Sequence, residues 1–458
     1  MSQPRPAPLF LAAVVLLSAE PGLVAQAAGE TGAPPPILDV EPVWSGHPVS
    51  FGIATAGDRQ YLAYYDAERR MSVASRSLDS TEWQFVRLPS RLGWDSHDGV
   101  AIAVDGAGHL HVSGNMHNEP LLYFRSVRPH DATTLEPAAM LGEREDRVSY
   151  PVFLEGPGGD LLFLYRDGAS GRGTMIVNAY DPASRTWRRL LDRPLLDGGR
   201  RHSAYPVGPT RGADGLFHLV WMWRKSASGD SNFDLSYARS ADLVRWESAS
   251  GANVELPITP RTKGVVVDPV RPGNGLVALG FGLGWDPERR PVVTYCRYGD
   301  RGRSQAFNAR WTGERWQIVQ ASDWEYRWPV DRKGALSHDI VVRPVSVDSD
   351  GRIVQWFHHV MFGEGGWVLD RASLRPVEAL DRPEPLQRLR RVESAFPGME
   401  ARDPVFDEQG DHYLRWETLP ANQDRPRNPP YPPPTMLRVH RVDRPERPAA
   451  PARDPGDA

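Results

Sequence analysis

The most regular feature of the chain is a run of alternating apolar and polar residues that follows a turn rich in glycine or charge. Seven such runs contain aromatic residues: GDRQYLAYYD from Gly57, GHLHVSGN from Gly108, GDLLFLYRD from Gly159, GLFHLVWMWR from Gly215, RRPVVTYCRY from Arg289, GRIVQWFHH from Gly351 and GDHYLRWET from Gly410. Alternation with a period of two is typical of β-strands. No segment sustains the period of about 3.6 residues that marks an amphipathic helix. The pattern therefore predicts an all-β protein.

The spacing of these runs indicates a repeat architecture. Successive runs start 51 to 74 residues apart, and most are followed by a second strand-like stretch and then a third that ends near a tryptophan. Several short strands in each of seven repeats are typical of a β-propeller, in which neighbouring sheets cover each other's faces. We therefore expect a seven-bladed β-propeller, with residues near 43–55 and 435–442 in adjacent strands that complete it.

The ends of the chain differ from this pattern. The N-terminus has one arginine, an apolar run from Leu9 to Leu17 and a small-residue cleavage site, which together predict a secretory signal peptide over residues 1–27. We expect a proline-rich disordered lead over 28–42, one propeller domain over 43–442 and a disordered tail over 443–458. The apolar run is too short to span a bilayer, so the protein is expected to be secreted or periplasmic, without a membrane span.

Charge and cysteine content narrow the function classes. Lys and Arg number 54 against 58 Asp and Glu, so the formal charge of −4 gives no basic field for nucleic acid. The single cysteine, Cys296, excludes an intramolecular disulfide, and its place in the strand-like VVTYCRY predicts a buried thiol. No Cys/His cluster has convincing ligand spacing. The lack of such a cluster predicts no metal or other cofactor. The protein is expected to be a monomer.

Residues 94–118, WDSHDGVAIAVDGAGHLHVSGNMHN, place one histidine at each outer end of a predicted hairpin. The chain turns at Asp105-Gly-Ala-Gly108, which brings His97 and His117 together in space. Because side chains alternate along a strand, arms of similar length allow both rings to lie on one side. From this stretch alone, a pair of exposed histidines without a role is an equally good interpretation.

A family resemblance gives these residues a context. The chain resembles the propeller family of BNR-4 repeat proteins, which includes ulvan lyases and related enzymes that cleave rhamnose–glucuronate glycans. The matching segments extend from about residue 44 to 440 and are AYYDAERRMSVASR, SHDGVAIAVDGAGHLHVSGNMHN, SYPVF, LYRDG, LSYARSADLVRWE, AFNARW and LRWETLPANQDRPR. The resemblance implies a lyase that acts on an acidic polysaccharide or oligosaccharide by β-elimination.

Such a lyase has three tasks at a uronic acid. It neutralises the carboxylate, removes the C5 proton and protonates the departing O4. In glucuronate the C5 hydrogen and O4 lie on the same side of the ring, so one residue can in principle move both protons. In iduronate they lie on opposite sides, which favours two residues.

By the same resemblance, five residues form the site, and they are His97, His117, Tyr150, Arg166 and Tyr205. Arg166 would neutralise the carboxylate, because a guanidinium binds carboxylates bidentately. His117 or His97 would take the C5 proton and Tyr150 would donate to O4, although these roles are interchangeable among the three. Tyr205 would help to position the sugar.

Other interpretations stay open. Arg166 is alternatively a structural residue that forms a salt bridge with Asp167 or Glu155. Because a proline follows both Tyr150 and Tyr205, each tyrosine is alternatively part of a turn with a purely structural role. His47, in WSGHPVSF, resembles the single catalytic histidine of a rhamnosidase branch of the family. An exo-acting α-L-rhamnosidase that uses His47, on the opposite face, is therefore the main alternative. A carbohydrate-binding propeller without catalysis is the other.

Overall fold

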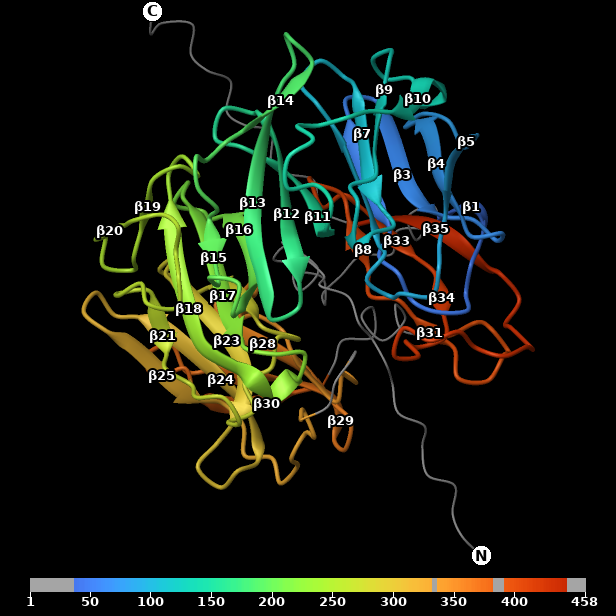
Figure 1. Ribbon diagram of the computed structural model, residues 1–458. Helices are drawn as coiled ribbons and strands as arrows, with labels where there is room; N and C mark the ends of the chain where they lie inside the picture. Colours follow the sequence, from blue (N-terminus) through green and yellow to red (C-terminus); the bar gives the residue numbers. More distant parts are fainter. Residues whose placement is uncertain (1–36, 332–335, 382–390, 443–458) are drawn as a thin grey trace, which may run out of the picture.

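The computed structural model describes residues 37–331, 336–381 and 391–442 (Figure 1). Within these ranges the structure is all-β, as predicted, and its helical residues are confined to two 3-10 turns, η2 (Ala132–Thr134) and η3 (Gly229–Ser231). The predicted signal peptide, residues 28–36 of the predicted lead and the predicted tail lie outside the described residues.

Seven antiparallel sheets of four to six strands follow one another along the chain. The first sheet contains β2 (Gly52–Ala56), β3 (Arg59–Tyr65), β4 (Arg70–Ser77) and β5 (Gln84–Arg91). The second contains β6 (Val100–Val104), β7 (Leu110–Gly114), β9 (Tyr123–Ser126) and β10 (Leu135–Pro137). The third contains β8 (His117–Glu119), β11 (Val148–Glu155), β12 (Leu161–Ala169), β13 (Arg172–Asp181), β14 (Thr186–Arg189) and β15 (Leu196–Asp197). The fourth contains β16 (Ser203–Arg211), β17 (Phe217–Arg224), β18 (Asn232–Ser240), β19 (Trp246–Glu247), β20 (Asn253–Val254) and β21 (Val266–Asp268).

The remaining sheets belong to the second half of the chain. The fifth contains β22 (Gly282–Trp285), β23 (Pro291–Tyr298), β24 (Ser304–Trp311) and β25 (Trp316–Gln320). The sixth contains β26 (Ile340–Val342), β27 (Ser346–Val347), β28 (Ile353–His359), β29 (Gly363–Leu369) and β30 (Pro376–Leu380), and the seventh contains β32 (Val405–Phe406), β33 (His412–Arg415), β35 (Thr435–Arg441) and β1 (Ile37–Val43). A further two-stranded sheet pairs β31 (Glu400–Ala401) with β34 (Glu417–Thr418).

The seven aromatic runs of the sequence form equivalent strands. They are β3, β7, β12, β17, β23, β28 and β33, and each lies between two neighbouring strands of its sheet. These strands are strongly buried, and β17 (FHLVWMWR) has seven buried residues of eight. A strand in the middle of a sheet that is covered on both faces needs large apolar side chains on both faces, which explains the aromatic content of the runs.

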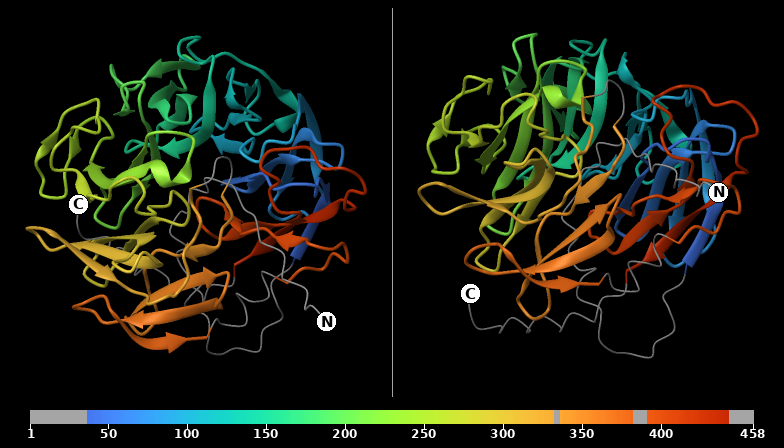
Figure 2. Two further views of the ribbon diagram at one scale, coloured as in Figure 1. Left: turned by 60° about the horizontal axis from the view of Figure 1, so that its bottom comes forward. Right: turned by 90° about the horizontal axis from the view of Figure 1, so that it is seen from below.

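The hydrophobic core lies between successive sheets. One buried cluster joins the second and third sheets, another the third and fourth, and further clusters join the fourth to the fifth and the fifth to the sixth. Seen from a second direction, the sheets succeed one another around a common centre in the order of the sequence (Figure 2). From the first sheet to the sixth, each sheet therefore covers a face of the next, and the shared clusters take the place of separate cores.

The first and last described strands lie side by side in one sheet. β1 pairs with β35 from Ile37 opposite His440 to Val43 opposite Thr435, and Arg438 Nε donates to Asp39 Oδ1 at 2.8 Å. A single buried cluster contains residues of the first, second and seventh sheets, including Val43 and Val439.

This pairing corrects two expectations from the sequence. Residues 37–42, expected in a disordered lead, form most of β1, because their backbone pairs with β35 and Val43 is fully buried. The partner of β35 is therefore β1 at 37–43 and not the segment 43–55, whose strand β2 belongs to the first sheet. The proline content of the lead concealed a strand whose one in-strand proline, Pro42, lies next to a register shift.

Cys296 lies in β23 with 1 % of its surface exposed, as expected. Burial raises the pKa of its thiol to about 12. The thiol stays protonated and packs as a small hydrophobic side chain.

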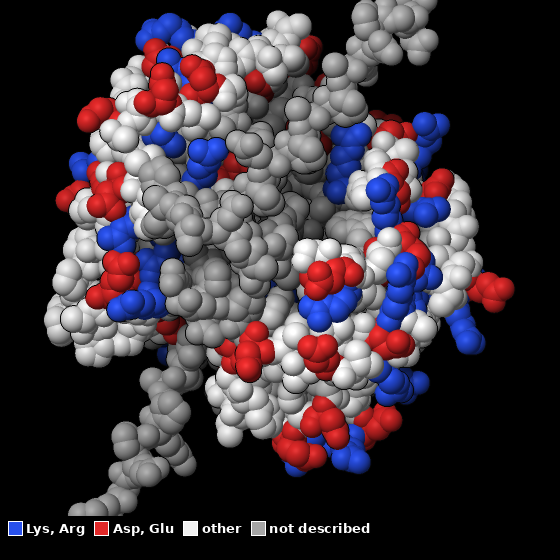
Figure 3. All heavy atoms as spheres, turned by 180° about the vertical axis from the view of Figure 1, so that it is seen from behind, with Lys and Arg blue, Asp and Glu red and all other residues white. Residues whose placement is uncertain are grey.

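The described surface is mixed in charge. On the face in Figure 3, Lys and Arg side chains alternate with Asp and Glu, and neither sign forms a continuous field. No helix among the described residues is long and apolar enough to cross a membrane.

The β1–β35 pairing predicts a large stability effect at Leu437, a fully buried residue of β35. We expect Leu437→Ala to lower the free energy of unfolding by about 2–5 kcal/mol, because it leaves a cavity in the cluster shared by the first and seventh sheets. Urea unfolding followed by tryptophan fluorescence measures this change.

Val377→Ala is the control, because Val377 lies on β30 with 66 % of its surface exposed. Its effect is expected within about 0.5 kcal/mol. Equal effects of the two substitutions would show that the β1–β35 sheet does not contribute to global stability.

Candidate active site

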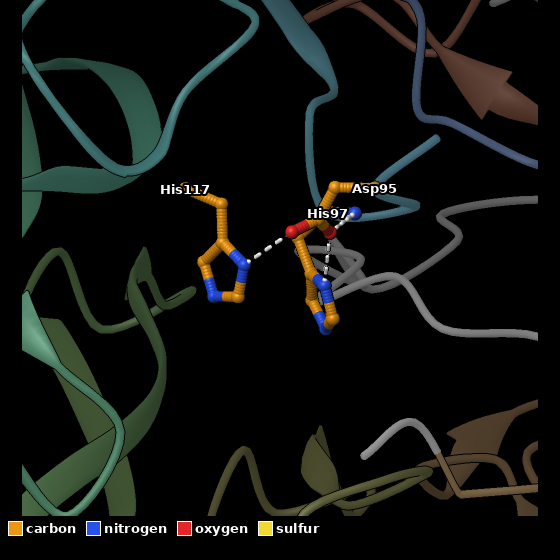
Figure 4. Close-up of side chains that lie close together, drawn as sticks. All are labelled: Asp95, His97 and His117. Atoms are coloured by element: carbon orange, nitrogen blue, oxygen red, sulfur yellow. Dashed lines mark hydrogen bonds and ion pairs between the residues drawn. The ribbon is translucent and has the colours of Figure 1, made fainter. Parts of the chain in front are cut away.

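His97 and His117 meet at one carboxylate, that of Asp95 (Figure 4). Asp95 Oδ1 lies 2.6 Å from His97 Nδ1, and Asp95 Oδ2 lies 2.8 Å from His117 Nδ1. The two imidazole rings are stacked, with centroids 4.3 Å apart. The turn that carries Asp95 is hydrogen-bonded to the loop before β35 of the seventh sheet, because Ser96 donates from N and Oγ to Asp424 Oδ1. The sequence prediction that both histidines lie together is consistent with this geometry.

The shared carboxylate fixes the tautomer of both rings. When Nδ1–H donates to Asp95, each Nε2 is left as the acceptor. Burial alone would raise the pKa of Asp95, but the hydrogen bonds from His117 and His97 outweigh it and hold this pKa well below its ordinary value. Burial also lowers the pKa of His117, more than the Asp95 hydrogen bond raises it. His117 is therefore a neutral base near neutral pH.

The same three residues offer ligand atoms to a metal ion. Their ligand atoms lie within 4.8 Å of one another, and a carboxylate with two imidazoles is a common donor set for zinc. In the structure, each carboxylate oxygen is instead within hydrogen-bonding distance of one Nδ1. This is the geometry of a carboxylate that orients two imidazoles.

Tyr150 reaches this cluster from a distorted part of β11. The register of β11 against β12 shifts between Ser149 and Val152, and Tyr150 has φ of 57°. A bulge and a positive φ at a large residue cost free energy and redirect the side chain. The redirected hydroxyl lies 3.4 Å from His117 Nε2, and the ring lies 5.9 Å from that of His97.

Arg166 lies on the other side of the Tyr150 ring, with its Cζ 4.6 Å from the ring centroid. Its Nε donates to Gly168 O and one Nη to Ser149 Oγ, both at 3.0 Å. The other terminal nitrogen, Nη1, is buried without a hydrogen-bond partner among the described residues. The expected alternative, a salt bridge with Asp167 or Glu155, is absent from the described part of the chain.

Gly173 makes room for this arginine. A Cβ at Gly173 would lie 2.7 Å from Arg166 Cγ and Cδ, closer than side-chain carbons approach. Its backbone N–H donates to Ser203 Oγ at 2.8 Å, which fixes β13 at this point. The absence of a side chain at position 173 therefore sets where the guanidinium lies.

Tyr205 adds a second phenol from the fourth sheet. Its hydroxyl is 2.7 Å from Ser170 Oγ, and Arg224 Cζ lies 3.9 Å from its ring centroid. Tyr150, Arg166 and Tyr205 line one cleft. The same cleft is bounded by the sixth sheet and the loop before the seventh through His338, Arg343 and Asp403. Its remaining lining is largely apolar and includes Val152, Leu164, Met175, Leu279, Phe281 and Val341.

His47 does not reach the cleft. It is 2 % exposed, its Nδ1 accepts from Trp44 Nε1 at 2.9 Å, and its ring packs 5.2 Å from that of Trp94. Burial, with Arg69 and Arg427 nearby, lowers its pKa to about 4. Because Trp94 directly precedes Asp95, His47 lies beside the histidine cluster, which corrects the expected position on the opposite face.

Three contributors were missed from the sequence. Asp95 precedes His97 by two residues, and this Asp-x-His spacing is the signal that could have identified it. Arg224 ends the WMWR run, whose pattern predicts a core strand and does not mark the arginine as a site residue. Gly173 had no sequence signal, because the contact with Arg166 arises only when β12 and β13 pair.

The fold of the chain is similar to that of solved polysaccharide lyases. A polysaccharide lyase of family PL25, an ulvan lyase, superposes with a TM-score of 0.57 at 14 % identity over 88 % of this chain and 95 % of its own. The same lyase bound to -[GlcA(1-4)Rha3S]- gives 0.56 at 14 % identity over the same shares of the two chains. The polysaccharide lyase Uly1 gives 0.56 at 12 % identity over 92 % of this chain and 95 % of that one. At these identities the likeness shows a shared fold.

No curated protein matches the chain in sequence. The profile of the BNR_4 family, described as BNR repeat-containing family member, matches residues 59–324. This range is more than half of the 458 residues and includes Asp95, both cluster histidines, Tyr150, Arg166 and Tyr205. The chain therefore belongs to the BNR repeat-containing family.

Proposed function

We propose that the protein is a secreted polysaccharide lyase that cleaves a rhamnose- and uronate-containing glycan by β-elimination. In this proposal the seven larger sheets are the blades of one seven-bladed propeller, a single domain that acts as a monomer. Residues 1–27 are proposed to direct export. The cleft that Tyr150, Arg166 and Tyr205 line holds the uronate.

One observation carries the proposal: Arg166 lines the cleft beside the Tyr150–His117 pair, and its buried Nη1 has no hydrogen-bond partner within the described part of the chain. An unpaired buried donor costs free energy unless a ligand satisfies it. A guanidinium matches the geometry of a carboxylate, which it binds through two parallel hydrogen bonds. The pair next to it, His117 and Tyr150, is able to move protons at the carbon and oxygen beside that carboxylate.

The proposed mechanism uses each group once. Arg166 binds the uronate carboxylate and withdraws charge as C5 becomes acidic. His117, kept neutral and oriented by Asp95, takes the C5 proton through Nε2. The C5–H electrons form the C4=C5 bond, the C4–O4 bond breaks, and Tyr150 gives its proton to O4. Because Arg166 neutralises the charge of the uronate carboxylate, the proposed mechanism needs no metal ion.

The substrate class is proposed from two sources. The similar solved structures are polysaccharide lyases, one of them bound to -[GlcA(1-4)Rha3S]-, and the cleft carries a cation suited to a uronate. The His47-dependent rhamnosidase gains no support, because His47 is buried against Trp44 and Trp94. Binding without catalysis is an outcome that the first experiment below distinguishes.

The first prediction concerns the reaction. Incubated with a rhamnose–glucuronate polysaccharide, the protein should produce ultraviolet absorbance from a C=C bond conjugated to the carboxylate. His117→Ala and Tyr150→Phe should each lower kcat by about 10²–10⁴-fold, because each removes a positioned proton carrier. Exposed His130→Asn is the control with unchanged turnover. Reducing ends without absorbance would indicate a hydrolase, and neither signal would indicate a binding protein.

The second prediction concerns Arg166. Arg166→Lys keeps one positive charge but loses the two fixed hydrogen bonds and the fork, so kcat/KM should fall about 10²–10³-fold on the glucuronate polymer. Arg245→Lys, with 87 % of its side chain exposed, should behave as the wild type. Near-normal kcat/KM in Arg166→Lys would remove the basis of the site.

The third prediction separates an orienting carboxylate from a metal ligand. Asp95→Asn should lower kcat by about 10²–10⁴-fold with little change in KM, because both imidazoles lose the acceptor that sets their tautomer. Wild-type activity should withstand EDTA. Loss of wild-type activity in EDTA, with recovery on adding Zn²⁺, would instead identify Asp95, His97 and His117 as a metal site.

A further inference from the structure

Three aromatic side chains lie together beside the histidine cluster, in the loops that precede β2, β6 and β35. They are Trp44, Trp94 and Tyr431, and their ring centroids are 5.7–5.8 Å apart. Tyr431 has 40 % of its surface exposed, and both indoles are partly exposed. Rings that stay partly exposed offer a flat apolar surface on which the C–H face of a sugar can pack. This aromatic group is therefore able to bind carbohydrate.

A guanidinium is already in contact with the two indoles of the aromatic group. Arg69 Cζ lies 4.9 Å from the ring centroid of Trp44 and 5.1 Å from that of Trp94. Its Nη1 also donates to Gly93 O at 3.2 Å. Gly46 leaves room for the Trp44 ring, because a Cβ there would lie 2.2 Å from Trp44 Cζ2. The cation–π contacts and the hydrogen bond thus hold Arg69 beside the aromatic group.

A second guanidinium, that of Arg427, belongs to the loop that carries Tyr431. The Tyr431 hydroxyl donates to Arg427 O at 3.0 Å, and one Nη of Arg427 donates to Pro420 O at 2.5 Å. Its Nε is buried without a hydrogen-bond partner among the described residues. The guanidiniums of Arg69 and Arg427 both lower the pKa of buried His47, so they lie near the same point of the structure.

Neither guanidinium forms an ion pair within the described part of the chain. Both acids of the turn that carries Arg69 pair with Arg70 instead, and Asp95 is shared by the two histidines. Burial lowers the pKa of both guanidiniums, and Glu400 opposes this shift only at Arg427. A partly buried cation without a counterion is stabilised when an anion binds to it. The charge beside the aromatic group therefore favours an anionic ligand.

The aromatic group is continuous with the histidine cluster. Trp94 directly precedes the carboxylate that holds both histidines. The loop before β35 carries Asp424, whose Oδ2 lies 3.7 Å from His97 Nδ1. The His97 ring is in turn 5.9 Å from that of Tyr150, which contacts Arg166. The histidines therefore lie between the cleft and the aromatic group, so a polysaccharide that crosses them can reach both.

We propose that the protein has a second carbohydrate site, which binds a further uronate of the same polysaccharide chain. Its residues are Trp44, Trp94, Tyr431, Arg69 and Arg427. The identity of this ligand rests on the proposed lyase function. The C–H face of the sugar packs on the exposed Tyr431 ring, and the two guanidiniums bind the carboxylate. The second site adds affinity for long chains, and the cleavage step stays in the cleft.

The test compares two oligosaccharides of one rhamnose–glucuronate polymer, a tetrasaccharide and a dodecasaccharide. Binding is measured by titration calorimetry on the full chain with His117→Ala, so that cleavage does not interfere. Arg69→Gln should weaken dodecasaccharide binding about 10–100-fold, because it removes charge-assisted hydrogen bonds to the uronate, and should change tetrasaccharide binding far less. Tyr431→Ala should show the same dependence on length, and Tyr431→Phe, which keeps the ring, should restore the affinity.

Steady-state kinetics give a second readout. Arg69→Gln should raise KM on the polymer with little change in kcat, because the second site contributes binding and takes no part in bond breaking. Phe85→Ala is the matched control, since Phe85 is also 40 % exposed but lies on β5, outside the aromatic group. This variant should bind both oligosaccharides as its parent does.

A carboxyl-reduced dodecasaccharide identifies the anion. With this ligand, Arg69→Gln should bind as its parent does, because the carboxylate that Arg69 contacts is gone. A persistent difference between the two proteins would overturn the uronate as the ligand of the second site.

Two further results would refute the second site. One is an equal loss on both oligosaccharides in Arg69→Gln, which would show a general effect on the protein. The other is unchanged dodecasaccharide affinity in both Arg69→Gln and Tyr431→Ala, which would leave the lyase function intact wherever the wild type still produces C=C absorbance. Length-dependent losses in a protein that produces no such absorbance would refute the lyase function and support the second site as a carbohydrate-binding site.

Discussion

The cleft depends on how the sheets are held about their common centre, and the pairing of β1 with β35 joins the two ends of that arrangement. Each sheet hides its faces against the sheets on either side, so a gap between the first and seventh would expose a large apolar surface. That gap is filled by a shared core in which Phe51 stacks on Trp416, with ring centroids 4.3 Å apart. The residues of the cleft come from separate sheets, so their mutual distances depend on the packing between those sheets.

Within this frame, the candidate site is built from local departures from regular strand geometry. Tyr150 has a positive φ at a bulge, Gly173 lacks the side chain that would displace Arg166, and a turn tied to Asp424 carries Asp95. The departures at Tyr150 and Gly173 cost stability and are tolerated because regular pairing continues on both sides of them. The buried sheets thus provide the rigidity, and the irregular ends of their strands provide the chemistry.

The sequence predicted the elements better than the contacts between them. Alternation with aromatic residues located the central strand of every large sheet, because burial on both faces leaves a strong local signal. The strand at 37–43 was missed, since its identity comes from β35, about 400 residues later in the chain. Tyr150 and Arg166 do lie in contact, yet Asp95 and Arg224 were not recognised. The spacing of Asp95 and His97 is a local signal, but the contact of Asp95 with His117 and that of Arg224 with Tyr205 arise only when separate strands come together.

The single carboxylate between His97 and His117 also limits how much charge the cluster can hold. With both rings neutral, the three groups together carry one negative charge. One added proton brings the cluster to zero net charge, whichever ring receives it, because the stacked imidazoles share the same counterion. A second would leave an uncompensated positive charge between two rings that are largely shielded from water. The one carboxylate can therefore offset the charge of one imidazolium, which is the charge that proton transfer to His117 would create.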